Sequence, residues 1–172
     1  MKILIVGHGE HGKDTLANSL SEKHGLKFLS SSKVIGWLFI HKLLENFYDS
    51  EEECFHDRRN NRELWASLIR DFNRNDKTRL VKLICESGDG YVGLRELNEL
   101  KEAVAEGLFT HVIWVIRTDK DEDDPTMTFN YNDVAVLQRR FSNFELLMVV
   151  NSSKNSLQEQ VKDGFIGKFL KL

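Results

Sequence analysis

A glycine-rich segment near the start of the chain constrains the fold more than any other feature. Lys2 to Val6 form a short, mainly apolar run typical of a strand buried on both faces. The run is followed by Gly7-His8-Gly9-Glu10-His11-Gly12-Lys13, which satisfies the spacing G-x-x-x-x-G-K. Leu16, Ala17 and Leu20 then recur at helical spacing. This order of strand, turn and helix predicts a phosphate-binding loop.

Each part of the motif has a physical task in binding a nucleoside triphosphate. Glycines let backbone N–H groups turn inward around phosphate oxygens, and the helix N-terminus adds positive potential. Lys13 reaches the β and γ phosphates and is expected to be catalytic. We expect ATP as cofactor, bound by Gly7, His8, Gly9, Glu10, His11, Gly12, Lys13, Asp14 and Thr15.

The residue after Lys13 is Asp14, where a Ser or Thr hydroxyl normally meets magnesium, and Thr15 follows it. Mg²⁺ accepts carboxylate oxygens readily, so we favour Asp14 as its ligand, directly or through water. The alternative is an acid that only benefits from the helix dipole. Thr15 is still placed to bond an α-phosphate oxygen.

The histidines have a plainer interpretation than their spacing suggests. His8 and His11 lie three apart, which suits two metal ligands, but no third ligand is near them in the sequence. We expect exposed loop side chains. The same expectation applies to His24, His41, His56 and His111, and Glu10 is expected to face solvent over the nucleotide.

Length and composition limit the architecture. The 172 residues suit one domain spanning 1–172, with 41% hydrophobic and 30% charged residues as in ordinary globular proteins. No stretch approaches the roughly 18–20 apolar residues of a membrane span, and the start lacks signal-peptide features. We expect a cytoplasmic protein without membrane partners, in which Cys54 and Cys85 stay reduced. The oligomeric state is left open.

Apolar runs and helical stripes alternate along the chain. The expected strands span 2–6, 27–29, 91–94, 111–116 and 146–150. Helical patterns separate them: Val34, Trp37, Leu38 and His41 mark one face, and Leu157, Val161 and Phe165 mark a closing helix over 156–172. This alternation predicts a three-layer α/β/α fold around a mostly parallel five-stranded sheet.

Other features narrow the class of nucleotide-binding protein. A GTPase would need an N-K-x-D segment, and the sequence contains none. An ATPase of the motor or helicase type usually ends a strand in an acid for magnesium, whereas the run from Tyr91 to Leu94 ends at Arg95. An arginine there suits an anionic acceptor; the alternative is a structural pair with Glu96 or Glu99. Residues 58–82 hold eight bases and three acids, which we interpret mainly as solvated helix faces.

Three motifs together resemble phage deoxynucleoside monophosphate kinases. They are Gly-Lys-Asp-Thr at 12–15, His-Asp-Arg-Arg-Asn-Asn-Arg at 56–62 with Trp65, and Tyr-Val-Gly-Leu-Arg at 91–95. The run 112–116 and an Asp-Pro-x-Met-Thr stretch at 124–128 follow in the same order. The resemblance implies an adenylate-kinase-like fold, an acceptor-binding helical region at about 30–86 and a lid at about 117–133. If the chain is phage-encoded, the compartment would be the host cytoplasm.

The resemblance also implies roles for individual residues. Arg58 and Arg62, four apart on a possible helical face, would grip the acceptor's phosphate together with Arg95. Arg117 would stack on adenine or reach a phosphate, and Asn151 would lie beside adenine. Asp57 would orient an arginine or meet the sugar, unless it forms a surface ion pair.

Further substrate-binding candidates have structural alternatives. Trp37 and Trp65 would stack on a base, although their helical spacing favours core packing. Ser31, within Ser30 to Ser32, would line the acceptor pocket or cap a helix. The lid carries an acidic run, Asp119, Asp121, Glu122, Asp123 and Asp124, interrupted by Lys120.

Three functions follow from these expectations. The first is transfer of the γ-phosphoryl group of ATP to a deoxynucleoside monophosphate, giving the diphosphate. The second keeps the chemistry and takes a hydroxymethylated pyrimidine in DNA as acceptor, the one hypothesis with a nucleic-acid partner. The third is an NTP-binding protein without transferase activity, which Asp14 and the arginine-poor lid favour.

Overall fold

The computed structural model describes residues 1–120, 124–153 and 155–172. Within these ranges five strands form one sheet in the order β2-β3-β1-β4-β5, and all neighbouring pairs are parallel. The strands are β1 (Ile3–Val6), β2 (Phe28–Ser30), β3 (Gly90–Val92), β4 (His111–Arg117) and β5 (Glu145–Asn151). The predicted α/β fold around a parallel five-stranded sheet is confirmed.

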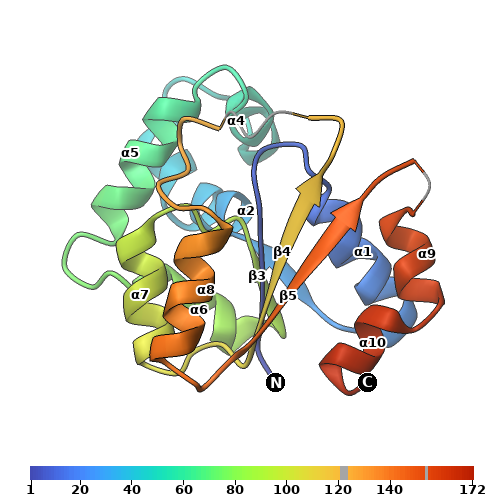
Figure 1. Ribbon diagram of the computed structural model, residues 1–172. Helices are drawn as coiled ribbons and strands as arrows, with labels where there is room; N and C mark the ends of the chain where they lie inside the picture. Colours follow the sequence, from blue (N-terminus) through green and yellow to red (C-terminus); the bar gives the residue numbers. More distant parts are fainter. Residues whose placement is uncertain (121–123, 154) are drawn as a thin grey trace.

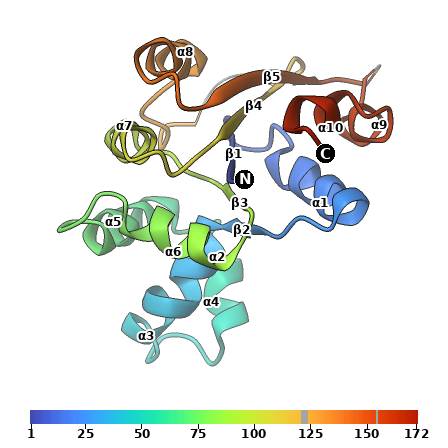
Figure 2. The ribbon, with the colours of Figure 1, turned by 90° about the horizontal axis from the view of Figure 1, so that it is seen from below.

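Helices cover both faces of the sheet, as Figures 1 and 2 show. One face carries α1 (Lys13–His24), α9 (Leu157–Lys162) and α10 (Phe165–Leu170). The other carries α2 (Ser31–Ile35), the π-helical turn η1 (Gly36–Ile40), α3 (His41–Leu43), α4 (Glu51–Asp57), α5 (Arg62–Phe72), α6 (Arg79–Ser87), α7 (Leu97–Ala105) and α8 (Tyr131–Arg140). The three-layer arrangement follows from this division.

The two faces of the sheet have separate hydrophobic cores. Successive side chains of a strand point to opposite faces, so Leu4 and Val6 pack with α2 and α5 to α8, while Ile3 and Ile5 pack with α1, α9 and α10. All four are fully buried. Burial on both faces explains why β1 is a continuous apolar run in the sequence.

Helix ends follow the local chemistry of the sequence. Gly25 ends α1 with a φ of 69°, where its N–H bonds the carbonyl of Ser21. The hydroxyl of Ser50 accepts a hydrogen bond from the backbone N–H of Glu53 and so caps α4. Gly107, with a φ of 71°, follows α7. Each of these helix ends thus has a local cause in the sequence.

The helical face expected over 34–41 is wrong. Ile35, Gly36 and Ile40 are buried instead, whereas Trp37 is 61% exposed. The cause is η1, a π-helical turn whose hydrogen bonds span five residues and which shifts the buried positions off the normal helical spacing. Core packing of Trp37 is therefore excluded in this structure.

The closing segment is two helices rather than one. Gly164 has a φ of 78° and separates α9 from α10. Leu157 and Val161 are buried as expected, but Phe165 is 54% exposed because the break rotates it out of the stripe.

Cys54 and Cys85 are both free thiols. In the described ranges, no helix combines the length and the apolar character that crossing a membrane would require.

Candidate active site

The glycine-rich loop lies at the C-terminal edge of the sheet, between β1 and α1 (Figure 1). Gly7 has a φ of 142°, and a Cβ there would lie 2.2 Å from the carbonyl oxygen of Val115. Gly12 has a φ of 103°, and a Cβ there would lie 2.8 Å from the side-chain nitrogen of Asn151. Contacts with β4 and β5 thus exclude larger residues at both positions, in addition to the turn itself.

The side chain of Lys13 runs along the inside of this loop. Its Nζ donates a hydrogen bond of 2.5 Å to the carbonyl oxygen of His8. Burial and, to a smaller extent, the charge of Arg95 lower the pKa of Lys13 to about 8, although the charges of Asp14 and Asp124 act in the opposite direction. The ammonium group is therefore poorly solvated and close to three other charged side chains.

The two loop histidines are buried, contrary to expectation, with exposed fractions of 7% for His8 and 0% for His11. The ring of His8 packs edge-on against Trp114, 5.8 Å between centroids. Nδ1 of His11 accepts a hydrogen bond from the backbone N–H of Arg117 at 3.3 Å. Both rings attach the loop to β4, a tertiary contact that their spacing in the sequence does not encode. His111, on β4, is also buried, at 7%.

Asn151, at the end of β5, supports the loop. Its side-chain amide donates a hydrogen bond of 3.1 Å to the carbonyl oxygen of His11. The expected position beside adenine remains a prediction; the observed contact is with the loop backbone.

Arg117 leaves the end of β4 and pairs with Asp119, with hydrogen bonds of 2.8 and 3.0 Å. Beside it, Lys120 forms an ion pair with Glu10, which is exposed as predicted and has a φ of 62°. Residues 121–123 of the predicted acidic lid lie outside the described residues.

The next described lid residue, Asp124, holds Arg95. Nη1 of Arg95 lies 2.5 Å from Oδ2 of Asp124 and also donates to the hydroxyl of Thr126. The Asp124 side chain is 2% exposed. Burial raises the pKa of this carboxyl, but hydrogen bonds from Thr126 and the charge of Arg95 outweigh burial and hold the pKa below its usual range. The acidic partner of Arg95 is thus Asp124, and not Glu96 or Glu99 as the structural alternative proposed.

Asp124 also lies against the glycine-rich loop. A Cβ on Gly9 would lie 3.2 Å from Oδ2 of Asp124 and 3.9 Å from Nη1 of Arg62. The 124–128 stretch thus brings a buried carboxylate to the place where Lys13, Arg62 and Arg95 converge. The sequence pattern grouped Asp124 with the acidic run of the lid and did not predict this position.

Arg58 and Arg62 do not share a helical face. α4 ends at Asp57, Arg58 follows it, and α5 begins at Arg62. The guanidinium of Arg58 donates a hydrogen bond of 2.8 Å to the carbonyl oxygen of Phe55. It also lies over the aromatic ring of Phe55, 3.7 Å from the ring centroid. Burial lowers the pKa of Arg58, and the nearby carboxylate of Asp14 raises it. Both arginines nevertheless lie close to the loop.

Asp57 organises the turn between these arginines. Its carboxylate accepts hydrogen bonds from Tyr48 at 2.6 Å, Asn60 at 2.8 Å and Asn61 at 2.6 Å. The first of these bonds is the main reason that the pKa of Asp57 lies below its usual range, and it raises the pKa of Tyr48 to about 12. Asp57 therefore positions the turn that carries Arg58 rather than forming the surface ion pair considered above.

The remaining candidates divide between core and pocket. Trp65 is 4% exposed and packs on Gly36, where a Cβ would lie 2.9 Å from the indole. Of the two roles considered for Trp65, base stacking and core packing, the structure thus shows core packing. Ser30 caps α2, and the hydroxyl of buried Ser31 donates to the carbonyl of Gly93 at 3.3 Å.

Asp14 fits a partial magnesium site. It is exposed in the first turn of α1, next to Lys13. Protein Mg²⁺ is typically held by one or two carboxylates plus phosphates and water, so a single exposed carboxylate beside a phosphate-binding loop is compatible with it. The described residues contain no cluster of three His, Cys, Asp or Glu side chains suited to a metal.

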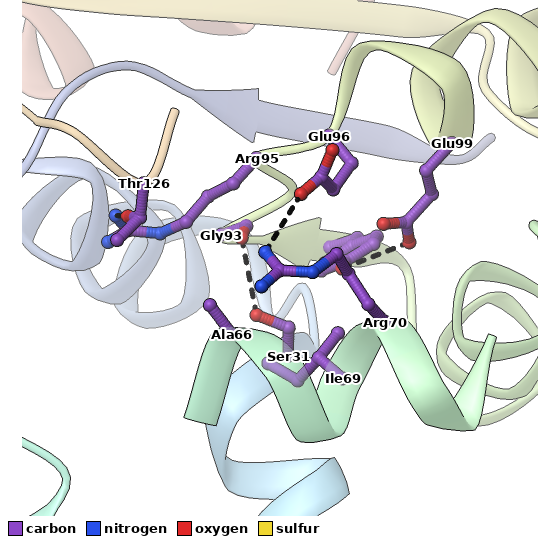
Figure 3. Close-up of a pocket in the computed structure, with 10 residues that line it drawn as sticks. Ser31, Ala66, Ile69, Arg70, Gly93, Arg95, Glu96, Glu99 and Thr126 are labelled. Atoms are coloured by element: carbon purple, nitrogen blue, oxygen red, sulfur yellow. Dashed lines mark hydrogen bonds and ion pairs between the residues drawn. The ribbon is translucent and has the colours of Figure 1, made fainter. Parts of the chain in front are cut away.

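A pocket of about 40 Å³ lies beside Arg95, between β3 and α5 (Figure 3). Arg95 and Thr126 lie at one end and Glu99 at the other, with Glu96 between them. Its wall is completed by Ser31, Ala66, Ile69, Arg70, Tyr91 and Gly93. Arg70 and Glu96 form an ion pair of 3.4 Å across this wall. Only Ser31 and Arg95 among these residues were predicted to bind substrate.

The overall fold has a counterpart among solved structures. Shikimate kinase from Bacteroides thetaiotaomicron superposes with a TM-score of 0.53 at 10% sequence identity, covering 100% of this chain and 99% of that protein. The fold resembles that of a shikimate kinase. This likeness agrees with the three-layer α/β fold predicted from the sequence, and it concerns the fold alone. No protein-family model and no curated protein matches the chain.

Proposed function

We propose that this protein is a P-loop kinase that transfers the γ-phosphoryl group of ATP to a deoxynucleoside monophosphate. The observation that carries the proposal is the convergence of Lys13, Arg62 and Arg95 around the glycine-rich loop, next to a pocket at the end of β3. Catalysis of phosphoryl transfer is mainly positioning and charge stabilisation, for which such a ring of cations is suited.

On the ATP side, the loop from Gly7 to Gly12 would surround the β phosphate with N–H groups. A phosphate oxygen would replace the carbonyl of His8 as the acceptor of the Lys13 ammonium group, and would compensate for the poor solvation that lowers its pKa. Asp14 would hold Mg²⁺, directly or through water, and this ion would neutralise charge on the phosphates. Arg117 would contact adenine or a phosphate of ATP, and Asn151 would lie beside adenine.

On the acceptor side, the region 30–86 would bind the monophosphate, with Arg58, Arg62 and Arg95 on its phosphate. An acceptor phosphate oxygen attacks the γ phosphorus in line; the bond from that phosphorus to the β–γ bridging oxygen breaks, and ADP leaves with the electron pair. The acceptor oxygen is already ionised, so no strong protein base is required. The lid at 117–133 would close over both substrates.

Replacing Asp14 by Ala is expected to raise the magnesium concentration needed for half-maximal rate, because a carboxylate oxygen near the ion is lost. The measurement is the initial rate of ADP release against free Mg²⁺ at saturating ATP. Glu22→Ala, at the other end of α1, is the matched control and should leave the curve in place. An unchanged magnesium dependence in the Asp14 variant would assign it only the helix-dipole role.

The function is tested by the acceptor requirement for ADP release. Release that depends on a free deoxynucleoside monophosphate supports the proposal. Release that depends only on hydroxymethylated DNA would favour the second hypothesis, although Arg70, Arg74 and Lys82 of the basic block 58–82 already lie in ion pairs with acids of this chain. Binding of ATP with no acceptor-dependent release would favour the third.

A further inference from the structure

A buried carboxyl group lines the pocket beside Arg95 and has no part in the phosphate chemistry above. Glu99, on α7, is 4% exposed. Its Oε1 accepts a long hydrogen bond, 3.5 Å, from the hydroxyl of Tyr91 on β3. Figure 3 shows both carboxyl oxygens turned toward the pocket interior, at the end away from Arg95. A buried acid at this place is available to a ligand group that enters the pocket.

The two ends of the pocket differ in chemistry. Arg95, with a side chain 36% exposed, supplies a charged fork suited to a phosphate. At the other end, the hydroxyl of Tyr91 and the carboxyl group of Glu99 belong to buried residues, and Ala66 and Ile69 of α5 give the pocket an apolar wall. A polar edge with apolar faces is what a heteroaromatic ring presents. A deoxynucleoside monophosphate has a phosphate at one end and such a ring at the other.

We propose that Glu99 forms hydrogen bonds with the base of the acceptor. It would select bases that carry an amino group next to an unprotonated ring nitrogen, as cytosine and adenine do. The proposal rests on the proposed function, because it takes the acceptor phosphate to lie at Arg95. It adds a specificity-determining residue and a substrate class to that function.

The protonation state of Glu99 supplies the hydrogen-bond pattern. Burial and the charge of Glu96 together raise the pKa of Glu99 to about 8, although hydrogen bonds from Tyr91 and Asn73 act in the opposite direction. Arg70 and Arg95 are the cations on the same pocket. Below pH 8 the carboxylic acid offers one O–H donor and one carbonyl acceptor side by side.

This pattern matches a ring nitrogen, which accepts, beside an amino group, which donates. Thymine lacks an amino group, and the N1 and N2 edge of guanine presents two donors, which an ionised carboxylate would match instead. The volume of about 40 Å³ has room for one or two water-sized groups, so the edge of a ring enters rather than a whole nucleoside.

The test is the equilibrium binding of dCMP, dAMP, dGMP and dTMP, measured by calorimetry at pH 6.5 and pH 9. Binding is chosen because it does not require turnover. The wild type is expected to bind dCMP or dAMP at least about tenfold more tightly than dTMP at pH 6.5. This preference should shrink at pH 9, because the ionised carboxylate has lost its donor.

Two variants separate recognition from folding. Glu99→Gln keeps a donor beside an acceptor, so it should bind like the wild type at pH 6.5 and retain its preference at pH 9. Glu99→Leu should lose about tenfold in affinity for the preferred monophosphate with little change for dTMP or ATP. Glu102→Gln, exposed on the same helix, is the control. Thermal unfolding of each variant reports on folding, and Glu99→Gln keeps the test informative if Glu99→Leu does not fold.

Three results would overturn the inference: equal affinity of the wild type for all four monophosphates, a preference for dTMP or dGMP at pH 6.5, or an equal loss for every ligand in Glu99→Gln. Failure of the proposed function is a different observation. It would appear as an absence of acceptor-dependent ADP release, whatever the order of affinities.

Discussion

Lys13→Ala is expected to abolish phosphoryl transfer, with a loss of at least about 10²–10³-fold in kcat, the scale of removing one group that stabilises developing charge. The Lys13 ammonium lies inside the glycine-rich loop, where its partner is a backbone carbonyl. Its removal leaves both hydrophobic cores intact, so the protein should remain folded. Rates of ADP release and thermal unfolding measure the two effects.

The control for this variant is Lys168→Ala, which removes an exposed ammonium group from α10. It should change neither the rate nor the melting temperature appreciably. Turnover retained in Lys13→Ala would refute the assignment of the loop as the ATP site.

Arg95→Lys should weaken use of the acceptor by about 1.5–3 kcal/mol, because a lysine keeps the charge but loses the bidentate fork. ATP affinity should barely change. The buried carboxylate of Asp124 retains a cation nearby in this variant, so the loss of stability should be small. Separate acceptor and ATP titrations, alongside thermal unfolding, make the measurement.

Asp124→Asn is the companion variant, since it removes the buried partner and leaves Arg95 in place. Because Asp124 is a buried acid with a depressed pKa, its contribution to stability is present at neutral pH and is lost as pH falls through that pKa. Arg74→Lys, in an exposed pair with Asp71, is the control for the arginine substitution. A lowered melting temperature with unaltered acceptor kinetics in Arg95→Lys would remove Arg95 from the acceptor site.

Local patterns were sufficient to predict the sheet and the loop. The run from Ile3 to Val6 is apolar throughout because β1 is buried on both faces, and Gly7 and Gly12 are where the turn needs positive φ. The position of Arg95 was predictable as well, because it comes shortly after β3, which ends at Val92, and ligands of parallel α/β folds collect at that edge of the sheet.

The errors arise where one segment depends on a distant one. The partner of Arg95 is Asp124, 29 residues further along, within what the sequence presents as an acidic run. The burial of His8 and His11 depends on β4, more than a hundred residues away. The π-helical turn at Gly36 to Ile40 moves Trp37 outward, and normal helical spacing cannot anticipate it.

The most direct test of the central claim is to follow the label from [γ-³²P]ATP in the presence of Mg²⁺ and each free deoxynucleoside monophosphate. The account predicts ADP and a deoxynucleoside diphosphate that carries the label in its β phosphate, in equal amounts, with Lys13→Ala giving neither. Label recovered only as inorganic phosphate, or only in hydroxymethylated DNA, would contradict it.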